Sequence, residues 1–347
     1  MNPAPWQVET WDRLVARARQ GALPHALLLA GPPGVGKRAL AERLAAFLLC
    51  ENRDDAPCGR CRSCRLYAVR AQRDPEETRP DGSLAQPDGY PGHPDARFVG
   101  FAFNDKSKKM YGEIVVEQIR ELSAWLALTP QVGRAQVVLI EPADAMNNAA
   151  ANALLKTLEE PNAARYLMLV SAHPARLPAT IRSRCQLIGF SLPPAEAGAT
   201  WLIEQGIDRP AAVAALAASA GNPGLALTWA REGRAALREE VAAHLRALQQ
   251  GKGNVAEIAG IWARNDTDTR LWFAAMLVQG EAAASAARTR GPLALTGDAD
   301  LTKLASWFDR ANRARDLLRG PLRAELVLLE LLVEWKAAAA ARRSRVA

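Results

Sequence analysis

A glycine-rich segment near the beginning of the chain matches most of a phosphate-binding loop. Residues 31–38 read GPPGVGKR and satisfy seven of the eight positions of the pattern G-x-x-x-x-G-K-(S/T). Glycines in this pattern let backbone N–H groups point at phosphate oxygens, and the lysine reaches the β- and γ-phosphates. The last position normally supplies a hydroxyl to Mg²⁺, but here it is Arg38, which argues against nucleotide chemistry. The residues expected to contact phosphate are Gly31, Gly34, Gly36 and Lys37.

A second acidic position points the same way. Metal-dependent nucleotide hydrolases have an apolar strand that ends in Asp, which holds Mg²⁺. Here the apolar run 137–140 is followed by Glu141 and Pro142. Glu141 keeps a carboxylate on a longer arm, whereas Pro142 has no group that could accept a proton. We therefore predict that the chain does not hydrolyse nucleotide by itself. We favour a retained glycine-rich loop that binds no ATP or ADP over a working nucleotide site.

Four of the five cysteines are clustered, with the spacing C-x₇-C-x₂-C-x₂-C. They are Cys50, Cys58, Cys61 and Cys64. Four thiolates suit a closed, tetrahedral, structural Zn²⁺ site, and an intracellular cluster of this kind favours metal over disulfides. The neighbouring arginines Arg53, Arg60, Arg62 and Arg65 would offset the thiolate charge. Reduced surface cysteines are one alternative. A redox C-x₂-C pair is a weaker one, because Cys61 belongs to two such steps.

Two arginines stand in residues 177–185, LPATIRSRC, after an apolar run. On its own this segment is typical of a surface turn. Downstream of a phosphate-loop fold, an arginine can also stabilise phosphoryl-transfer charge at the nucleotide of a neighbouring subunit.

Composition limits the class of protein. The 347 residues allow two to three domains of ~100–200 residues each. A net charge of +7 favours nucleic acid or another acidic partner only weakly. No apolar run approaches the ~18 residues of a membrane span, and the first residues lack the layout of a signal peptide. We therefore expect a cytoplasmic protein with no membrane partner.

Short apolar runs alternate with helical patterns in the first half of the chain. Strands are expected at 26–30, 137–140 and 166–170, and helices at 7–20, 37–49, 115–128 and 147–158. This alternation predicts an α/β fold with a largely parallel sheet. The polar, proline-rich segment 72–92 is expected to be a mobile loop.

After Pro193 we expect helices only. The expected domains are a phosphate-loop domain at 1–193 with the cysteine cluster at 50–64, a small helical lid at 194–233, a larger helical domain at 234–336 and a basic tail at 337–347.

The order of these motifs resembles a known family. GPPGVGK, the four cysteines, His93-Pro94-Asp95, NALLKTLEEP at 152–161 and Ser183-Arg184-Cys185 are similar to the clamp-loader subunits of bacterial DNA polymerase III, which belong to the AAA+ class. The resemblance covers most of the chain and becomes general beyond residue 195. It implies an AAA+ domain, a helical lid and an all-α collar that forms the oligomer.

Within that family the motor subunits, tau and gamma, are the alternative. They carry Ser or Thr after the loop lysine, an Asp-Glu pair at the second acidic position and a nucleotide-sensing arginine in the lid. This chain has Arg38, then Glu141-Pro142, and no arginine in residues 221–225. All three departures favour a member that does not hydrolyse ATP.

The resemblance implies an accessory subunit of the DNA-directed DNA polymerase holoenzyme rather than an enzyme. Its implied partners are the tau or gamma motor subunits, the delta subunit, the sliding clamp and, through the assembled complex, primed DNA. Arg184 becomes the candidate arginine finger, acting in trans on a neighbouring ATPase. Two other hypotheses remain: an active motor-like ATPase, and a stand-alone nucleic-acid binder. The second ranks last, because the sequence has no stripe of interleaved aromatic and basic residues.

Overall fold

The computed structural model describes residues 3–80, 82–295, 300–318 and 322–340. It divides into two compact units. The first comprises Met1–Trp201 with Asn222–Gly224, and the second comprises Leu202–Gly221 with Leu225–Ala347. The predicted fold class is confirmed, because the first unit contains a parallel sheet with helices, and the described residues after 194 contain helices and connecting turns but no strand. Of the predicted basic tail, residues 341–347 lie outside the described residues.

The first unit is built on a five-stranded sheet whose paired strands are all parallel. In spatial order the strands are β4 (Ala96–Val99), β7 (Gln136–Ile140), β8 (Arg165–Ser171), β1 (Ala26–Ala30) and β9 (Gln186–Gly189). The three predicted strands correspond to β1, β7 and β8. Sequence analysis missed β4 and β9, which are the short edge strands. Arg97 in β4 and Gln186 in β9 interrupt the continuous apolar run that marks a buried strand.

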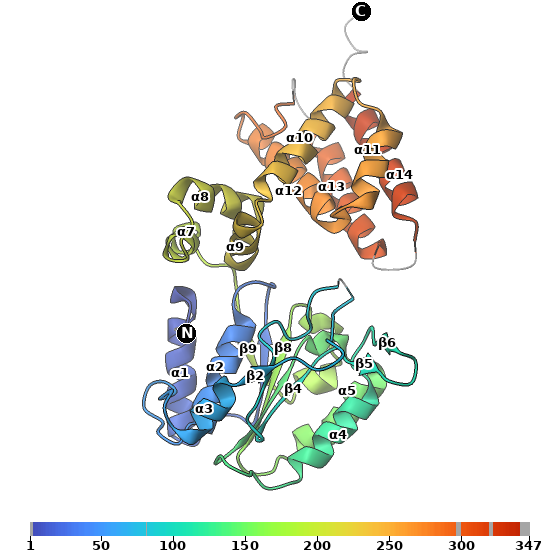
Figure 1. The fold of residues 1–347 in the computed structure, drawn as a ribbon. Helices are drawn as coiled ribbons and strands as arrows, with labels where there is room; N and C mark the ends of the chain where they lie inside the picture. The colour runs from blue at the N-terminus through green and yellow to red at the C-terminus, as the bar shows by residue number, and fades with distance from the viewer. Residues whose placement is uncertain (1–2, 81, 296–299, 319–321, 341–347) are drawn as a thin grey trace, which may run out of the picture. The chain divides into compact units, whose positions relative to one another are not determined.

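Helices cover both faces of this sheet (Figure 1). Helices α1 (Val8–Arg19) and α2 (Lys37–Leu49) pack on one face, and α4 (Val116–Leu126) and α5 (Asn148–Glu159) pack on the other. Because both faces are covered, every residue of β1 is buried. Leu27 and Leu29 join the core with α1 and α2, whereas Leu28 joins the core with α4 and α5. The four predicted helices are confirmed, with ends shifted by at most two residues.

Shorter elements fill the connections of the first unit. They are η1 (Pro5–Gln7), α3 (Arg62–Ala68), β2 (Arg70–Ala71), β3 (Tyr90–Pro91), β5 (Phe103–Asn104), β6 (Lys109–Met110), η2 (Ala143–Ala145), η3 (Pro174–Arg176) and α6 (Ala179–Arg182). The expectation of a mobile loop at 72–92 misses how this segment packs. Its residues Glu77, Ala85 and Gln86 are buried.

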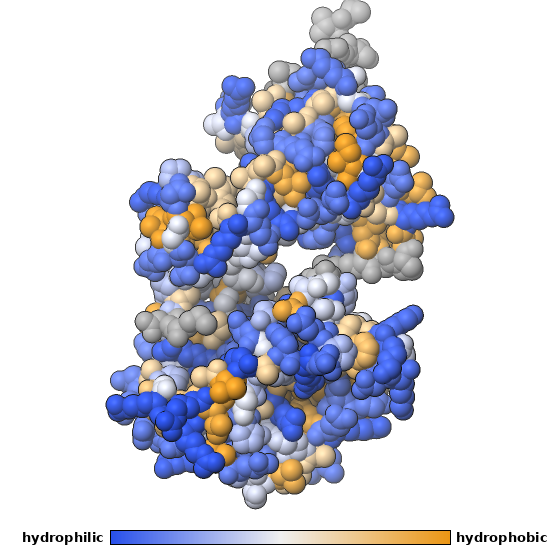
Figure 2. All heavy atoms as spheres, in the orientation of Figure 1, coloured by the Kyte–Doolittle hydropathy of each residue, from blue (hydrophilic) through white to orange (hydrophobic). Residues whose placement is uncertain are grey.

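The second half of the chain is helical, and the described residues after β9 contain no strand, as predicted. The helices are α7 (Ala195–Glu204), α8 (Arg209–Ala218), α9 (Pro223–Arg231), α10 (Ala235–Gln249), α11 (Val255–Arg264), α12 (Thr267–Ala286), α13 (Leu301–Leu317) and α14 (Ala324–Ala340). Helices α10 to α14 share one core around the buried side chains of Trp262, Phe273 and Trp335. On the outside, apolar residues are scattered among polar ones (Figure 2).

In the part of the chain that the structure describes, no single helix has the length and apolar composition needed to cross a membrane. Helices α8 and α9 meet that test only as a pair, with a bend of 118° between them.

A buried carboxylate ties β4 to the loop before β7. Asp95 is fully buried, and its two carboxylate oxygens accept hydrogen bonds from the backbone N–H groups of Gln131, Val132 and Gly133 at 2.6, 2.8 and 2.7 Å. Hydrogen bonds that are donated to a carboxylate are among the stronger ones in proteins. Asp95 therefore holds the loop that leads into the strand before Glu141.

Replacing this carboxylate should destabilise the first unit. In Asp95→Ala, three backbone N–H groups lose a buried carboxylate acceptor, and we expect the free energy of unfolding to fall by about 3 kcal/mol. Urea unfolding followed by circular dichroism measures this loss. Asp105→Ala, at an exposed position, is the matched control and should change stability by less than about 0.5 kcal/mol. Equal stability of the two variants would contradict the assignment.

Candidate functional site

The glycine-rich loop joins the carboxyl end of strand β1, which lies between β8 and β9 in the sheet, to helix α2. This is the edge of a parallel sheet at which ligands bind in α/β folds. Gly34 and Gly36 have φ values of 76° and 83°, which glycine adopts without strain. At Gly31 a Cβ atom would lie 2.2 Å from the carbonyl oxygen of Phe190, so only glycine fits. The backbone therefore has the form of a phosphate-binding loop.

The loop lysine interacts with the loop itself. Lys37 is buried, and its Nζ donates hydrogen bonds to the carbonyl oxygens of Gly31 and Pro32, both at 2.6 Å. Burial lowers the pKa of Lys37 from 10.5 to about 8, and the carboxylates of Glu141 and Asp144 oppose this effect. The amine that would reach phosphate in a nucleotide site is thus engaged by its own backbone.

Side chains from other segments donate hydrogen bonds to further carbonyl oxygens of the loop. The Val35 carbonyl oxygen accepts hydrogen bonds from Trp6 Nε1 at 3.1 Å and from Gln7 Nε2 at 2.8 Å. The Pro33 carbonyl oxygen accepts one from Asn222 Nδ2 at 2.5 Å. Asn222 lies in residues 221–225, which contain no arginine. The chain therefore supports the loop with its own donors.

The guanidinium of Arg38 is surrounded by oxygen acceptors. Its Nε donates to Glu42 at 2.7 Å, and its Nη1 donates to Glu141 at 2.8 Å. Nη2 also donates to the side-chain oxygen of Gln86, and Nη1 lies 3.4 Å from the carbonyl oxygen of Ala85. Burial acts to lower the pKa of Arg38, but the carboxylates of Glu141 and Glu42 outweigh burial and raise it. The guanidinium is therefore a fixed positive charge.

The second acidic position contains more than the predicted Glu141. Asp144 accepts hydrogen bonds from Ser171 Oγ at 2.6 Å and from the N–H of Ala172 at 3.2 Å, and His173 Nδ1 lies 3.3 Å away. Burial acts to raise the pKa of Asp144, but hydrogen bonds, led by the one from Ser171, lower it overall. Ser171 is the last residue of β8, and residues at the carboxyl ends of parallel strands often line a ligand site. Its position in the sequence could therefore have marked it as a site residue. Gln86 lies in a polar loop, where no sequence pattern could have marked it as a site residue.

Arg184 is separate from this cluster. It follows α6, and its Nη1 donates to the carbonyl oxygen of Thr180 at 3.0 Å. Its Nη2 forms an ion pair with Glu159 on α5 at 2.6 Å, and the arginine side chain is 36% exposed. Both partners lie outside the phosphate loop. The arginine is thus held at the surface by a neighbouring helix.

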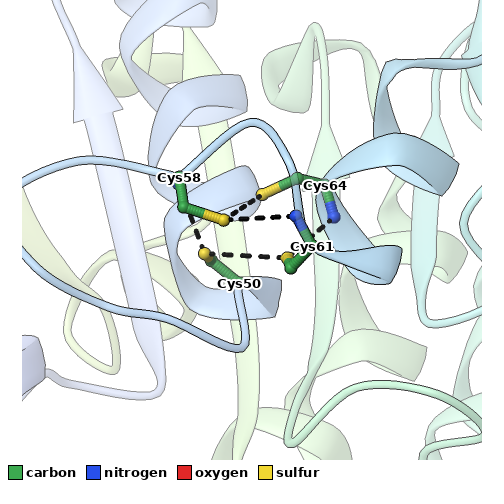
Figure 3. A group of neighbouring side chains, drawn as sticks. All are labelled: Cys50, Cys58, Cys61 and Cys64. Carbon is green, nitrogen blue, oxygen red and sulfur yellow. Dashed lines mark hydrogen bonds between the residues drawn. The ribbon is translucent and has the colours of Figure 1, made fainter.

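The four clustered cysteines converge on one point (Figure 3). Their sulfur atoms all lie within 4.8 Å of one another, with Cys50–Cys61 at 3.9 Å and Cys58–Cys64 at 4.0 Å. Sulfurs around a tetrahedral Zn²⁺ with ~2.3 Å bonds would be roughly 3.8 Å apart, so the spacing fits. Backbone N–H groups of Arg60 and Cys61 lower the pKa of Cys58 to about 6, which favours a thiolate. The four cysteines could therefore hold a metal ion, with no position left open.

This cluster is attached to both the phosphate-loop helix and the sheet. Cys50 directly follows α2 as its C-terminal cap. His93 Nδ1 accepts the N–H of Asp95 at 3.0 Å, so Nε2 carries the proton and donates to Ser63 Oγ at 2.8 Å. Burial lowers the pKa of His93, which keeps this neutral form. The His93-Pro94-Asp95 motif thus anchors the cysteine segment to β4.

Comparison with known proteins identifies the family. A family model described as "DNA polymerase III, delta subunit" matches residues 6–194. The DNA polymerase III subunit delta' of Pseudomonas aeruginosa is 34% identical, and the match covers 95% of this chain and 96% of that relative. The chain belongs to the DNA polymerase III delta-prime family. The predicted resemblance to subunits of bacterial DNA polymerase III is thereby confirmed.

Two further relatives define the limits of this similarity. The delta' subunit of Escherichia coli is 37% identical over 64% of this chain and 59% of its own length. The tau subunit of Salmonella typhimurium is 34% identical over 48% of this chain and 21% of its own length. The Pseudomonas aeruginosa delta' subunit thus matches nearly the whole chain, the Escherichia coli delta' subunit about two thirds of it, and tau about half of it.

The buried amine of Lys37 should make the stability of the domain depend on pH. Between about pH 8 and 10.5 the unfolded chain would bind a proton that the folded chain has released, so rising pH should stabilise the folded state. Lys37→Met removes this contribution. The stability of the unmodified protein relative to Lys37→Met should therefore increase from about pH 7 to about pH 10, as measured by urea unfolding. Lys156→Met, which removes an exposed lysine of α5, is the matched control. A pH-independent difference for Lys37→Met would refute the assignment.

Proposed function

We propose that this delta-prime family member is a non-hydrolysing subunit of the clamp loader, which helps to load the sliding clamp onto primed DNA. Its proposed partners are the tau or gamma motor subunits, delta, the clamp and DNA held by the assembled complex. The observation that carries the proposal is the ion pair between Arg38 and Glu141, at 2.8 Å. It joins the two positions that would otherwise share a Mg²⁺ ion.

Three groups that ATP hydrolysis at this loop would need are missing or already engaged. Mg²⁺ would need the hydroxyl that Arg38 replaces, Glu141 is neutralised by that arginine, and Pro142 cannot orient a water. In addition, Lys37 is bonded to its own loop. The alternative, an active motor-like ATPase, requires turnover by the isolated chain that Lys37→Ala abolishes.

We further propose that Arg184 acts in trans on the ATP of an adjacent motor subunit. An arginine supplied by a neighbour stabilises the charge that develops on the transferred phosphoryl group. Support comes from its exposure and from its ion pair with Glu159, which limits the freedom of a long side chain at the surface. The role needs no nucleotide in the subunit's own loop.

Removing Arg184 should slow the assembled loader without dismantling it. In a loader reconstituted with motor subunits, delta and clamp, Arg184→Ala should lower DNA-stimulated ATP hydrolysis by roughly tenfold or more. Size-exclusion chromatography should give the same complex. Arg182→Ala is the matched control, because this exposed arginine lies two residues away and donates to the carbonyl oxygen of Pro174. The proposal is contradicted if the loader with Arg184→Ala hydrolyses ATP as fast as the unmodified loader, or if Arg182→Ala causes an equal loss.

We propose that the ion held by the four cysteines is a structural Zn²⁺. Four thiolates leave no position for a substrate or water, so the ion would brace the fold rather than catalyse. Arg53, whose Nη2 donates to the Leu48 carbonyl oxygen at 2.6 Å, brings positive charge close to the thiolates. The ion would fix the end of α2 against α3.

Metal analysis tests this site. Protein purified without chelator should contain about one zinc per chain, and Cys61→Ser should lose the metal and unfold at a lower temperature. Cys185→Ser, outside the cluster, should keep its zinc. The proposal fails if the unmodified protein carries no stoichiometric zinc.

We also propose that residues 194–233 form the lid and residues 234–336 the oligomer-forming collar. The shared core of α10 to α14 supports a separate collar.

A further inference from the structure

Arg38 binds oxygens from three separate segments of the chain. Glu42 lies one turn further along the same helix, Glu141 follows β7, and Ala85 and Gln86 belong to the segment 72–92. The side chains of Arg38 and Glu141 are only 15% and 18% exposed. Two carboxylates and two neutral oxygens around one positive charge resemble the ligand set of a hard cation.

The place of this charge follows from the motif. In a working phosphate-loop enzyme, the residue after the lysine and the acid at the strand end hold the same Mg²⁺ ion. In this chain the side chain at the first position reaches the carboxylate at the second one directly. The guanidinium therefore takes the space between these two positions.

The segment 72–92 is built to keep Gln86 in place. Gln86 is 1% exposed, and its backbone oxygen accepts a hydrogen bond from Gln72 Nε2 at 2.8 Å. Arg79 donates to the carbonyl oxygens of Leu84 and Ala85, at 2.9 and 3.3 Å. The acceptors that face Arg38 are thus fixed by contacts within the segment.

A second network anchors the same segment. Buried Glu77 pairs with Arg73 at 3.0 Å and accepts a hydrogen bond from the hydroxyl of Tyr90, while the Arg73 guanidinium lies 4.0 Å from the centre of the Tyr90 ring. Glu42 is shared, because Arg70 also pairs with it at 3.0 Å. Negative charge near the loop is thus balanced by arginines of this chain.

We propose that Arg38 is a built-in cation that replaces Mg²⁺ in this domain, and that residues 72–92 form the cap that retains it. The phosphate loop then reaches its packed state without Mg²⁺ or nucleotide. This inference deepens the non-hydrolysing role proposed above, but its test needs only the isolated full chain.

Thermal unfolding of the unmodified protein and two variants, each with and without millimolar Mg²⁺, tests the inference. The unmodified protein should have the same Tm in both conditions. Arg38→Thr, which restores the hydroxyl of the motif, should lower Tm by about 5 °C or more without Mg²⁺, because Glu42 and Glu141 lose their partner. Mg²⁺ should then raise its Tm by roughly 2 °C or more, since the freed carboxylates can bind the ion. Arg13→Thr, at an exposed position of α1, should show neither effect.

A second pair of variants covers the case in which Arg38→Thr does not fold. Arg38→Lys keeps a positive charge and should remain insensitive to Mg²⁺. Gln86→Ala removes one acceptor of the cap and should lower Tm by less than Arg38→Thr does, again without a response to Mg²⁺. The inference is overturned if Arg38→Thr is as stable as the unmodified protein, if Mg²⁺ leaves its Tm unchanged, or if Mg²⁺ stabilises the unmodified protein or Arg38→Lys. A failure of the Arg184 experiment in the loader would leave these results unaffected, so the two proposals are separable.

Discussion

The ion pair between Arg38 and Glu141 is the constraint around which the phosphate-loop domain is arranged. It brings the start of α2 and the end of β7 together through a charge that belongs to the chain. A buried charge is tolerated only when it is paired and hydrogen-bonded, and here Glu42, Ala85 and Gln86 supply the remaining acceptors. The same principle governs the loop, where Lys37 donates to carbonyl oxygens rather than reaching into open solvent.

The cysteine cluster belongs to this arrangement rather than standing apart from it. Cys50 caps the helix that begins with Lys37 and Arg38, so the cluster holds the far end of the element that carries the site. Ser63 and His93 join the cluster to β4, and Tyr67 on α3 donates to the Glu42 carbonyl oxygen at 3.0 Å. A subunit that acts on a neighbour's nucleotide would benefit from such bracing, because a group supplied in trans must be held in a fixed position.

Much of the fold could be predicted because its signals are local. The buried strands β1, β7 and β8 are continuous apolar runs, and the helices that cover them have a clear periodicity. The edge strand β9 lacks such a run, because only Leu187 and Ile188 are apolar between Gln186 and Gly189. The packing of segment 72–92 was the largest feature that the sequence did not predict. Its burial depends on single polar residues, Glu77 and Gln86, whose partners are distant in sequence or carry no pattern.

The sequence by itself determined the class of site: a phosphate loop without its hydroxyl, an acidic strand end without its base, and four cysteines at metal-binding spacing. These are statements about residue types at fixed spacing, which a single sequence contains. Only the tertiary structure decided that Arg38 pairs with Glu141 and Gln86, that Lys37 turns back on its loop, and that Asn222 supports Pro33. Those contacts join residues as far as 189 positions apart, and they depend on which buried donors and acceptors the packed chain brings within hydrogen-bond distance.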